Sequence, residues 1–479
     1  MVTPSQGRSG APGAPQSGAN TPPRPRLGTA SGPLTRRDFV RTAFGGAGLA
    51  LAAVPTTPVR AQTASAPAAS TAANSRIRYA LIGLGAQGRV LIDALQRIGG
   101  IEMVAIVDIW PYVRTYTERL LKRSGITVKS YASTEEMLAA EKDLDAAIVA
   151  TPDFWHAPVT NMCLRAGLHV YCEKMMSNTV EGARSMVTTM RETGKLLQIG
   201  HQRRSNPRYR FALQRLLNEA QICGRLTAAQ AQWNRAASPD LGWPKNSEMP
   251  ADLLKKWGFE NMHQFRNWRW FRALGGGPLS DLGAHQIDIF PWFLGTHPST
   301  VFASGGNDYY SGRECADNAM VIYEFPMPSG GTVRAFYQVQ TTTSAGGGYF
   351  EYFMGDQGSL RISENPRLSV LYREASAPDW SPWVAKNYLR AQPAPVTTPT
   401  ETAVDVRETA PLQSYDIPVT FAKAIHQPHL ENFFSAMQGK AQLTCPADEA
   451  FSSEYIIHKA NQSMDARRIL EFTPGEFEA

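Results

Sequence analysis

The pattern of apolar and polar positions divides the chain into two regions that meet near residue 200. Before that point, short apolar runs alternate with longer segments in which apolar residues recur every three or four positions. Short runs of this kind are typical of buried strands, and the longer period is typical of amphipathic helices. Strands that alternate with helices predict a parallel sheet with helices on both faces, joined by right-handed crossovers.

The same pattern gives the expected elements of the first region. Strands are expected at 79–82, 101–107, 144–150, 169–172 and 196–199. Ser133 and Asn178 each stand three residues before a glutamate and are expected to begin helices. Gly167 and Gly194 are expected to end helices. The first helix follows residue 88 and carries apolar residues at Val90, Leu91, Ala94, Leu95 and Ile98.

Beyond residue 200 the pattern changes to strands separated by turns. Alternation predicts strands at 224–233, 320–325, 332–340, 349–354 and 368–373. Because few helical segments lie between them, these strands should form a large, mainly antiparallel open sheet. Helical periodicity over 427–479 indicates closing helices. The fold class is therefore α/β, with a parallel-sheet domain at 76–200 and an α+β domain at 201–479.

The turn after the first strand carries the clearest chemistry. Its sequence, Gly83-Leu84-Gly85-Ala86-Gln87-Gly88, is a G-x-G-x-x-G pattern between a strand and a helix. Gly83 permits a tight turn, Gly85 lets backbone approach a pyrophosphate, and Gly88 lets the helix pack closely on the strand. Asp108 ends the second strand 20 residues beyond Gly88, where a carboxylate can bind ribose hydroxyls. These features predict a Rossmann domain that binds NAD in preference to NADP, since an acid repels a 2′-phosphate.

Charge does not point to a nucleic-acid partner. The chain of 479 residues has a net charge of +6, and residues 1–61 account for all of it with seven arginines against Asp38. The remainder is formally neutral, so no surface for a polyanion is indicated. No later stretch is apolar for long enough to span a bilayer, so no membrane insertion of the mature protein is expected.

The N-terminal residues have the composition of an export signal. Arg36 and Arg37 precede a short Gly/Ala/Leu run that ends in Val59-Arg60-Ala61. Paired arginines, a short apolar segment and small residues before a cleavage point are typical of a twin-arginine signal peptide. We expect a disordered N-terminus and signal over 1–61, a linker over 62–75, and a mature protein that is periplasmic or secreted.

The cysteines indicate neither disulfides nor a metal site. There are five, an odd number, widely spaced and without a C-x-x-C pair. No cluster supplies three metal ligands at a suitable spacing, so no metal is expected. Buried free thiols suit a protein that folds in the cytosol before export. The cysteines are Cys163, Cys172, Cys223, Cys315 and Cys445.

Three further segments stand at expected strand ends. They are Thr151-Pro152-Asp153-Phe154-Trp155-His156, residues 166–174, and Gly200-His201-Gln202-Arg203-Arg204. With the glycine-rich turn they resemble the Gfo/Idh/MocA oxidoreductases, a family that includes glucose–fructose oxidoreductase and inositol dehydrogenases. The resemblance covers about residues 76 to 295 well. It implies a tightly bound NAD held by Gly83, Gly85, Gln87, Gly88, Asp108, Thr151, Pro152, His156, Glu173 and Lys174.

The resemblance also implies the catalytic groups. Glu173 and Lys174 occupy the family's E-K-P motif, whose lysine lies beside the nicotinamide and positions or polarises a substrate hydroxyl. Here Met175 replaces the proline, and Asp153 stands where the family usually has Asn. A lysine at a strand end can also be a surface residue with a buried stem. Its place at the expected ligand edge favours a functional role.

A D-x-x-x-H pattern supplies the remaining catalytic candidates. Asp281 and His285 match it, and the resemblance implies His285 as the acid/base and Asp281 as its substrate-side partner. In a helix the two residues lie one turn apart on one face, where a carboxylate can orient an imidazole. A buried core histidine and a surface ion pair are the non-functional alternatives.

These residues predict an exported NAD(P)-dependent oxidoreductase that transfers hydride between a carbohydrate or polyol carbon and the nicotinamide. One alternative is an NAD-dependent glycoside hydrolase of the same fold, which oxidises a ring carbon transiently, eliminates and re-reduces. Another is a binding or sensory protein that keeps NAD structurally. The resemblance further implies a homo-oligomer formed through the C-terminal sheet. The Trp- and Arg-rich stretch over 234–272 fits either a sugar pocket or ordinary packing.

Overall fold

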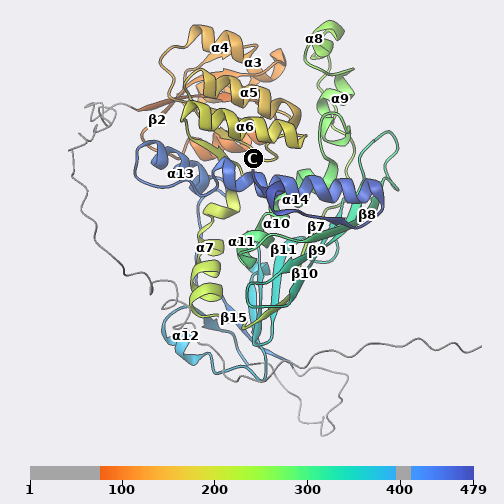
Figure 1. Cartoon of the computed structure of the whole chain (residues 1–479). Coiled ribbons are helices and arrows are strands. Elements are labelled where there is room, and N and C mark those ends of the chain that lie inside the picture. Colours follow the sequence, from red (N-terminus) through yellow and green to blue (C-terminus); the bar gives the residue numbers. More distant parts are fainter. Residues whose placement is uncertain (1–75, 395–410) are drawn as a thin grey trace, which may run out of the picture. The chain divides into compact units, whose positions relative to one another are not determined.

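The apolar runs before residue 200 form a parallel sheet in the computed structural model, which describes residues 76–394 and 411–479 (Figure 1). The six strands lie in the order β3-β2-β1-β4-β5-β6. Five of them were expected, and β3 is an addition. The central strand, β1, carries the glycine-rich turn and lies between β2 and β4. The strands are β1 Ile77–Ile82, β2 Ile101–Val107, β3 Lys129–Tyr131, β4 Ala146–Val149, β5 His169–Cys172 and β6 Leu197–Ile199.

Helices cover this sheet, and their ends agree with the capping signals except at one position. Ser133 Oγ accepts a hydrogen bond from Glu136 N at the start of α4. At α6 the cap is Thr179, which accepts from Gly182 N, whereas the Asn178 amide donates to the carbonyl of Ala273. The expectation that Asn178 begins this helix is therefore wrong by one residue. The helices are α2 Ala86–Leu95, α3 Pro111–Arg123, α4 Thr134–Ala140, α5 Asp153–Arg165 and α6 Val180–Thr193.

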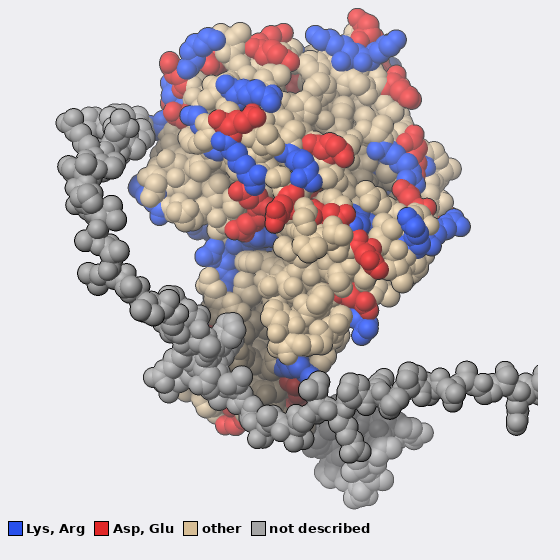
Figure 2. All heavy atoms as spheres, viewed as in Figure 1, with Lys and Arg blue, Asp and Glu red and all other residues tan. Residues whose placement is uncertain are grey.

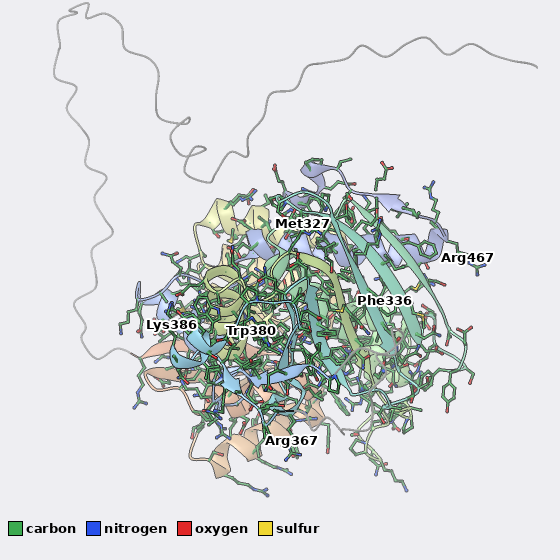
Figure 3. All side chains as sticks on the ribbon, turned by 90° about the horizontal axis from the view of Figure 1, so that it is seen from below. Met327, Phe336, Arg367, Trp380, Lys386 and Arg467 are labelled. Atoms are coloured by element: carbon green, nitrogen blue, oxygen red, sulfur yellow. The ribbon has the colours of Figure 1, made fainter. Side chains whose placement is uncertain are left out.

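The second region forms a ten-stranded sheet that is antiparallel except where β7 pairs with β10 (Figures 1 and 3). Alternate residues of its strands face the core, so β9 buries Val321 and Tyr323 and exposes Met320 and Ile322. Phe336 on β10 is labelled in Figure 3. Strands β8, β12, β14, β15 and β16 were not expected from the sequence. The main strands are β7 Leu226–Asn234, β8 Thr300–Gly306, β9 Asn318–Pro326, β10 Thr332–Gln340, β11 Tyr349–Gly355, β12 Gly358–Ile362 and β13 Val370–Arg373; the edges carry β14 Arg390–Ala391, β15 Gln413–Asp416 and β16 Leu470–Glu471.

The closing helices pack against both sheets. Helix α13 (Gln427–Met437) buries Phe433 on one face of the first sheet. Helix α14 (Ala447–Ala466) contacts α6 and β8, and it buries Phe451 with the first sheet and Ile457 with the second. Figure 1 shows α14 running between the two sheets. The domain bounds 76–200 and 201–479 stay predictions, and the last helices serve both regions.

The remaining expectations concern the surface and the N-terminus. Figure 2 shows Lys and Arg interspersed with Asp and Glu on the face in view, without a large area of one sign. All five cysteines are free and buried. The expected signal over 1–61 and linker over 62–75 lie outside the described residues. Within 76–394 and 411–479, no helix is long and apolar enough to cross a membrane.

Candidate active site

In the glycine-rich turn, one glycine has room for a side chain and two others do not. Gly83 has φ +95, and a Cβ there would collide with the Ala150 carbonyl. A Cβ at Gly88 would collide with the Gly83 carbonyl, so both glycines are required by packing. At Gly85, the N-cap of α2, no protein atom apart from its chain neighbours and its own helix backbone lies within 4 Å of the Cβ position. This space at a helix N-terminus fits the pyrophosphate of a dinucleotide, as the sequence predicts.

Asp108 lies beside this turn and stabilises it through hydrogen bonds. Its Oδ2 accepts from Leu84 N at 2.8 Å, and its Oδ1 accepts from Trp110 N at 2.8 Å. Burial raises the pKa of this carboxyl, and the two amides oppose that rise. A carboxylate oxygen accepts more than one hydrogen bond, so each can still bind a ribose hydroxyl. Asp108 therefore has a structural task besides the predicted one.

Gln87 connects the turn to the end of β5 and to a residue that the sequence did not single out. Its Nε2 donates to Glu173 Oε1 at 3.1 Å and lies 3.0 Å from Nε2 of His426. Glu173 also accepts from the Tyr171 hydroxyl at 3.2 Å. His426 precedes α13 and is half-buried. Its place 339 residues from Gln87 in sequence explains why no local pattern revealed it.

The Thr151–His156 stretch follows β4 and contains three predicted cofactor residues. Thr151 Oγ1 is buried and has no hydrogen-bond partner among the described residues, so it can bind a ligand. Pro152 is the N-cap of α5. The ring nitrogens of His156 lie 2.6 Å from the Met175 carbonyl and 2.7 Å from that of Thr151. His156 thus joins two loops of the sheet edge, and burial lowers its pKa to about 4.

Lys174 reaches from the edge of the first sheet to the segment that carries the catalytic candidates. Its Nζ donates to the carbonyl of Asp281 at 2.6 Å. With methionine at position 175, the lysine is directed toward the segment that carries Asp281 and His285. The Asp281 carboxylate accepts from Arg269 Nε at 2.8 Å, and Arg269 is a site residue that the sequence did not reveal. The pKa of Asp281 is lowered, because the charges of Arg269 and Lys174 outweigh burial.

The expected pairing of Asp281 with His285 is not observed. Residues Leu279–Gly283 form a π-type turn before α10 (Ala284–Ile287), so the spacing of an α-helix does not apply between the two residues. The Nδ1 atom of His285 is buried and has no hydrogen-bond partner among the described residues. Burial, and then the charge of Lys174, hold the pKa of His285 well below its usual value. The imidazole is neutral near pH 7 and can accept a proton.

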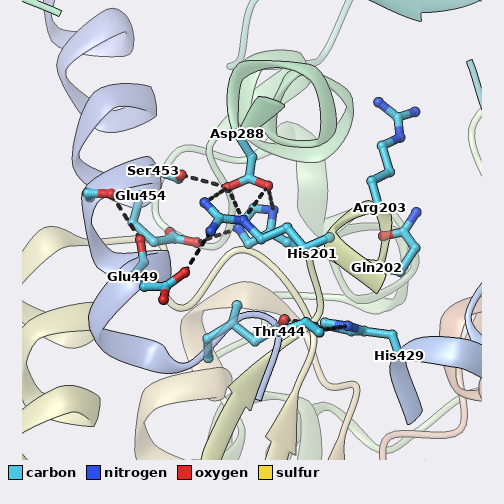
Figure 4. A network of polar contacts seen from close by, with 12 residues as sticks. His201, Gln202, Arg203, Asp288, His429, Thr444, Glu449, Ser453 and Glu454 are labelled. Atoms are coloured by element: carbon cyan, nitrogen blue, oxygen red, sulfur yellow. Dashed lines mark hydrogen bonds and ion pairs between the residues drawn. The ribbon is translucent and has the colours of Figure 1, made fainter. Parts of the chain in front are cut away.

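A buried polar network, drawn in Figure 4, contacts the loop that follows Lys174. Glu454 on α14 accepts from Met176 N at 2.8 Å and so holds the loop that follows the lysine. His201 lies 3.9 Å from Glu454 and 3.8 Å from Asp288. Arg204 donates to Asp288 at 2.7 Å. Arg204 is therefore held within the fold, and the network fixes the loop that follows Lys174.

Two family models match adjacent regions of the chain. One is described as the oxidoreductase family with an NAD-binding Rossmann fold and matches residues 77–201. The other is described as the GFO/IDH/MocA C-terminal domain and matches residues 212–361.

Similar proteins of known name match parts of the chain. The rhizopine catabolism protein MocA of Rhizobium meliloti is 27% identical over 51% of this chain and 65% of that protein. A 1,5-anhydro-D-fructose reductase of Ensifer adhaerens is 29% identical over 62% of this chain and 80% of that protein. An inositol 2-dehydrogenase of Rhizobium meliloti is 24% identical over 48% of this chain and 58% of that protein. The chain thus matches less than two thirds of the length of two of these relatives.

Solved structures share the fold. The aldose-aldose oxidoreductase of Caulobacter crescentus has a TM-score of 0.60 at 19% identity, covering 83% of this chain and all (100%) of that chain. The WlbA dehydrogenase of Bordetella pertussis, in complex with NADH and UDP-GlcNAcA, has a TM-score of 0.58 at 18% identity and covers 83% of this chain and 99% of that chain.

Proposed function

Because the chain belongs to the Gfo/Idh/MocA family of NAD-binding oxidoreductases, we propose that it transfers hydride between a carbon of a carbohydrate or polyol and a bound nicotinamide. The names of two relatives, a 1,5-anhydro-D-fructose reductase and an inositol 2-dehydrogenase, support this substrate class. Asp108 at the end of β2 supports NAD rather than NADP.

The observation that carries this proposal is the hydrogen bond from Lys174 to the Asp281 carbonyl. It joins the edge of the first sheet to the segment that bears His285, and the charge of Lys174 is close enough to contribute to the lowered pKa of that imidazole. The nicotinamide, when bound, supplies the redox chemistry. His285 accepts the proton of the substrate hydroxyl, and the Lys174 ammonium stabilises the negative charge that develops on that oxygen. Arg269 holds Asp281 in place for both.

A direct test follows the redox state of the nicotinamide. The purified protein is incubated with NAD and a panel of polyols and aldoses, and NADH absorbance is recorded in single and multiple turnovers. We expect at least one compound to reduce the cofactor in wild type and not in His285→Ala. NAD binding without reduction by any compound would contradict the dehydrogenase proposal and favour a binding role.

A glycoside hydrolase is the second candidate. It is favoured by one relative, a glycosyl hydrolase family 109 protein of Stenotrophomonas maltophilia, which is 29% identical over 34% of this chain and 34% of that protein. In such a reaction the cofactor is oxidised and reduced within one turnover. Release of sugar from an aryl glycoside without net NADH would establish it, and net NADH formation would exclude it.

Export by the twin-arginine route is part of the proposal and rests on Arg36 and Arg37. A protein folded with its cofactor before export suits this route. Replacing both arginines with lysine should leave full-length protein in the cytosol, as shown by fractionation and immunoblotting. Mature double mutant in the periplasm would contradict the signal.

A homo-oligomer through the second sheet is also proposed. The outward face of this sheet exposes Phe302, Met320 and Ile322, at 39%, 45% and 43%. Such a patch is typical of a protein interface. Light scattering should show that Ile322→Lys lowers the oligomeric state. The control, Tyr116→Lys on α3, starts from a similar exposure of 48% and should not.

A further inference from the structure

Residues 235–272, called here the bridging segment, contact the loop after β2 and the start of α5 after β4, which flank the strand that carries the glycine-rich turn. In the sheet, β1 lies between β2 and β4. Ligands of such sheets bind outside the carboxyl ends of the strands, beside the central turn. The bridging segment meets the chain just after β2 and again just after β4. It carries helices α8 (Ala251–Lys256) and α9 (Met262–Arg266).

The first anchor is at Trp110, two residues after Asp108. Its Nε1 donates to the carbonyl of Ser247 at 2.6 Å. The ring of Phe265 meets the indole edge-on at 5.6 Å. The guanidinium of Arg266 lies 5.1 Å from the indole centre, where a cation–π contact is favourable. Since the backbone of Trp110 also donates to Asp108, this anchor is built into the ribose end of the predicted site.

The second anchor is at Phe154 and Trp155, just after β4. Trp155 Nε1 donates to the Trp257 carbonyl at 3.1 Å, and the two indoles pack edge-on at 5.4 Å. Phe154 and Phe259 pack in the same way at 5.4 Å. Gly258 has φ +82, and a Cβ there would lie 3.3 Å from Phe154. Only glycine suits both this backbone conformation and this close approach.

The bridging segment is packed rather than loosely attached. Its apolar residues Met249, Leu254 and Met262 are buried in the same core cluster as Leu84 of the glycine-rich turn. Its C-terminal end carries Arg269, which pairs with Asp281. The segment therefore extends from the Asp108 end of the predicted dinucleotide site to its catalytic end. The anchors follow β2 and β4, and the open space at Gly85 follows β1, the strand between them.

We propose that the bridging segment closes the dinucleotide site and keeps the cofactor bound between turnovers. The inference rests on one part of the proposed function, the binding of a dinucleotide, and does not depend on which substrate is oxidised. If the cofactor leaves after one anchor opens, its dissociation rate is proportional to the population of the open state. Weakening an anchor should then accelerate release without changing the residues that touch the cofactor.

The test measures release of NADH from the purified full chain. NADH fluorescence is followed after mixing with a large excess of NAD⁺. Trp257→Ala removes the indole at the second anchor. Truncation of a well-packed aromatic contact typically costs 1–2 kcal/mol, which corresponds to dissociation about 5- to 30-fold faster. The milder Trp155→Phe keeps an aromatic ring beside Trp257 and removes the hydrogen bond to its carbonyl together with part of the indole packing, so it serves if Trp257→Ala does not fold.

The matched control is Trp383→Ala. Trp383 on α12 (Ser381–Ala385) is half-buried like Trp257 but packs on Tyr388 in the second region, near Trp380 and Lys386 of Figure 3. Faster release in the anchor variant and an unchanged rate in the control support the proposal. Wild-type release rates in Trp257→Ala or Trp155→Phe, or equal acceleration in the control, overturn it. Slow release with no dehydrogenase activity would sink the proposed reaction and leave the bridging segment standing.

Discussion

Replacing Gly85 with alanine should separate cofactor binding from folding. Gly85 has φ −64 and ψ −161, an extended conformation with negative φ that is open to alanine, and apart from its chain neighbours and its own helix backbone no protein atom lies within 4 Å of the new Cβ. Alanine also restricts the unfolded chain, so the free energy of unfolding without cofactor should stay unchanged or rise by about 0.4–1 kcal/mol. The methyl group enters the space that a pyrophosphate needs, so NAD affinity should fall.

The magnitude can be read from ligand-linked stability. At an NAD concentration 100 times its Kd, wild type gains about 2.7 kcal/mol of unfolding free energy. If the Cβ weakens binding by about 100-fold, the same concentration equals the new Kd, and the gain falls to about 0.4 kcal/mol. Urea denaturation with and without NAD measures both quantities. A Gly85→Ala protein that NAD stabilises as much as wild type would refute the placement of the pyrophosphate.

Two other glycines are matched controls. A Cβ at Gly99 also meets nothing within 4 Å, but that glycine lies in the turn before β2, so Gly99→Ala should keep the full NAD effect. A Cβ at Gly88 collides with the Gly83 carbonyl, so Gly88→Ala should lose stability even without NAD. The three variants therefore distinguish loss of the ligand space from loss of the fold.

Three further predictions concern His285, Lys174 and Asp153 of the candidate active site. His285→Ala should bind NADH normally by fluorescence while turnover falls by about 10²–10⁴-fold, since a positioned base is lost; a smaller loss would exclude proton transfer by this ring. Lys174→Ala should lower kcat at all substrate concentrations, because the ammonium stabilises charge that develops only in the transition state; wild-type kcat on the true substrate would remove Lys174 from the mechanism. Burial raises the pKa of Asp153 to about 7, so the folded state binds this proton more tightly and stability should fall as pH rises from about 4 to 7. Asp153→Asn should remove that fall. In urea denaturation, the free energy of unfolding of the variant minus that of wild type should be larger at pH 8 than at pH 5, and an equal difference at both would contradict the prediction.

The strands that could be predicted from sequence are those with strong patterns. Strand β10 (Thr332–Gln340) was expected with its observed ends, since apolar and polar residues alternate along it. Strand β8 (Thr300–Gly306) was missed because its second half is Ser and Gly, which carry little β-propensity. Strand β3 has only three residues, and none is fully buried. Its position follows from pairing with β2, which no local pattern records.

The site divides in the same way. Lys174 and His285 stand in motifs and could be found in the sequence, whereas Arg269 and His426 could not. Arg269 joins the site through its bond to Asp281, and His426 through its contact with Gln87. Contacts of this kind depend on how the two regions fold together. The Trp-rich stretch was open between a sugar pocket and packing, and its tryptophan contacts with the first sheet favour packing.

The π-type turn before α10 changes what the D-x-x-x-H pattern means. The Asp281 carboxylate is paired with Arg269, and the Asp281 backbone carbonyl accepts from Lys174. His285 then receives no orienting bond at Nδ1 from the described residues. A neutral ring donates from one nitrogen and accepts at the other, so no bond at Nδ1 from the described residues fixes the tautomer. If His285 is the base, as proposed, a substrate hydroxyl bound to one ring nitrogen would fix the tautomer, and proton transfer would then depend on that hydrogen bond.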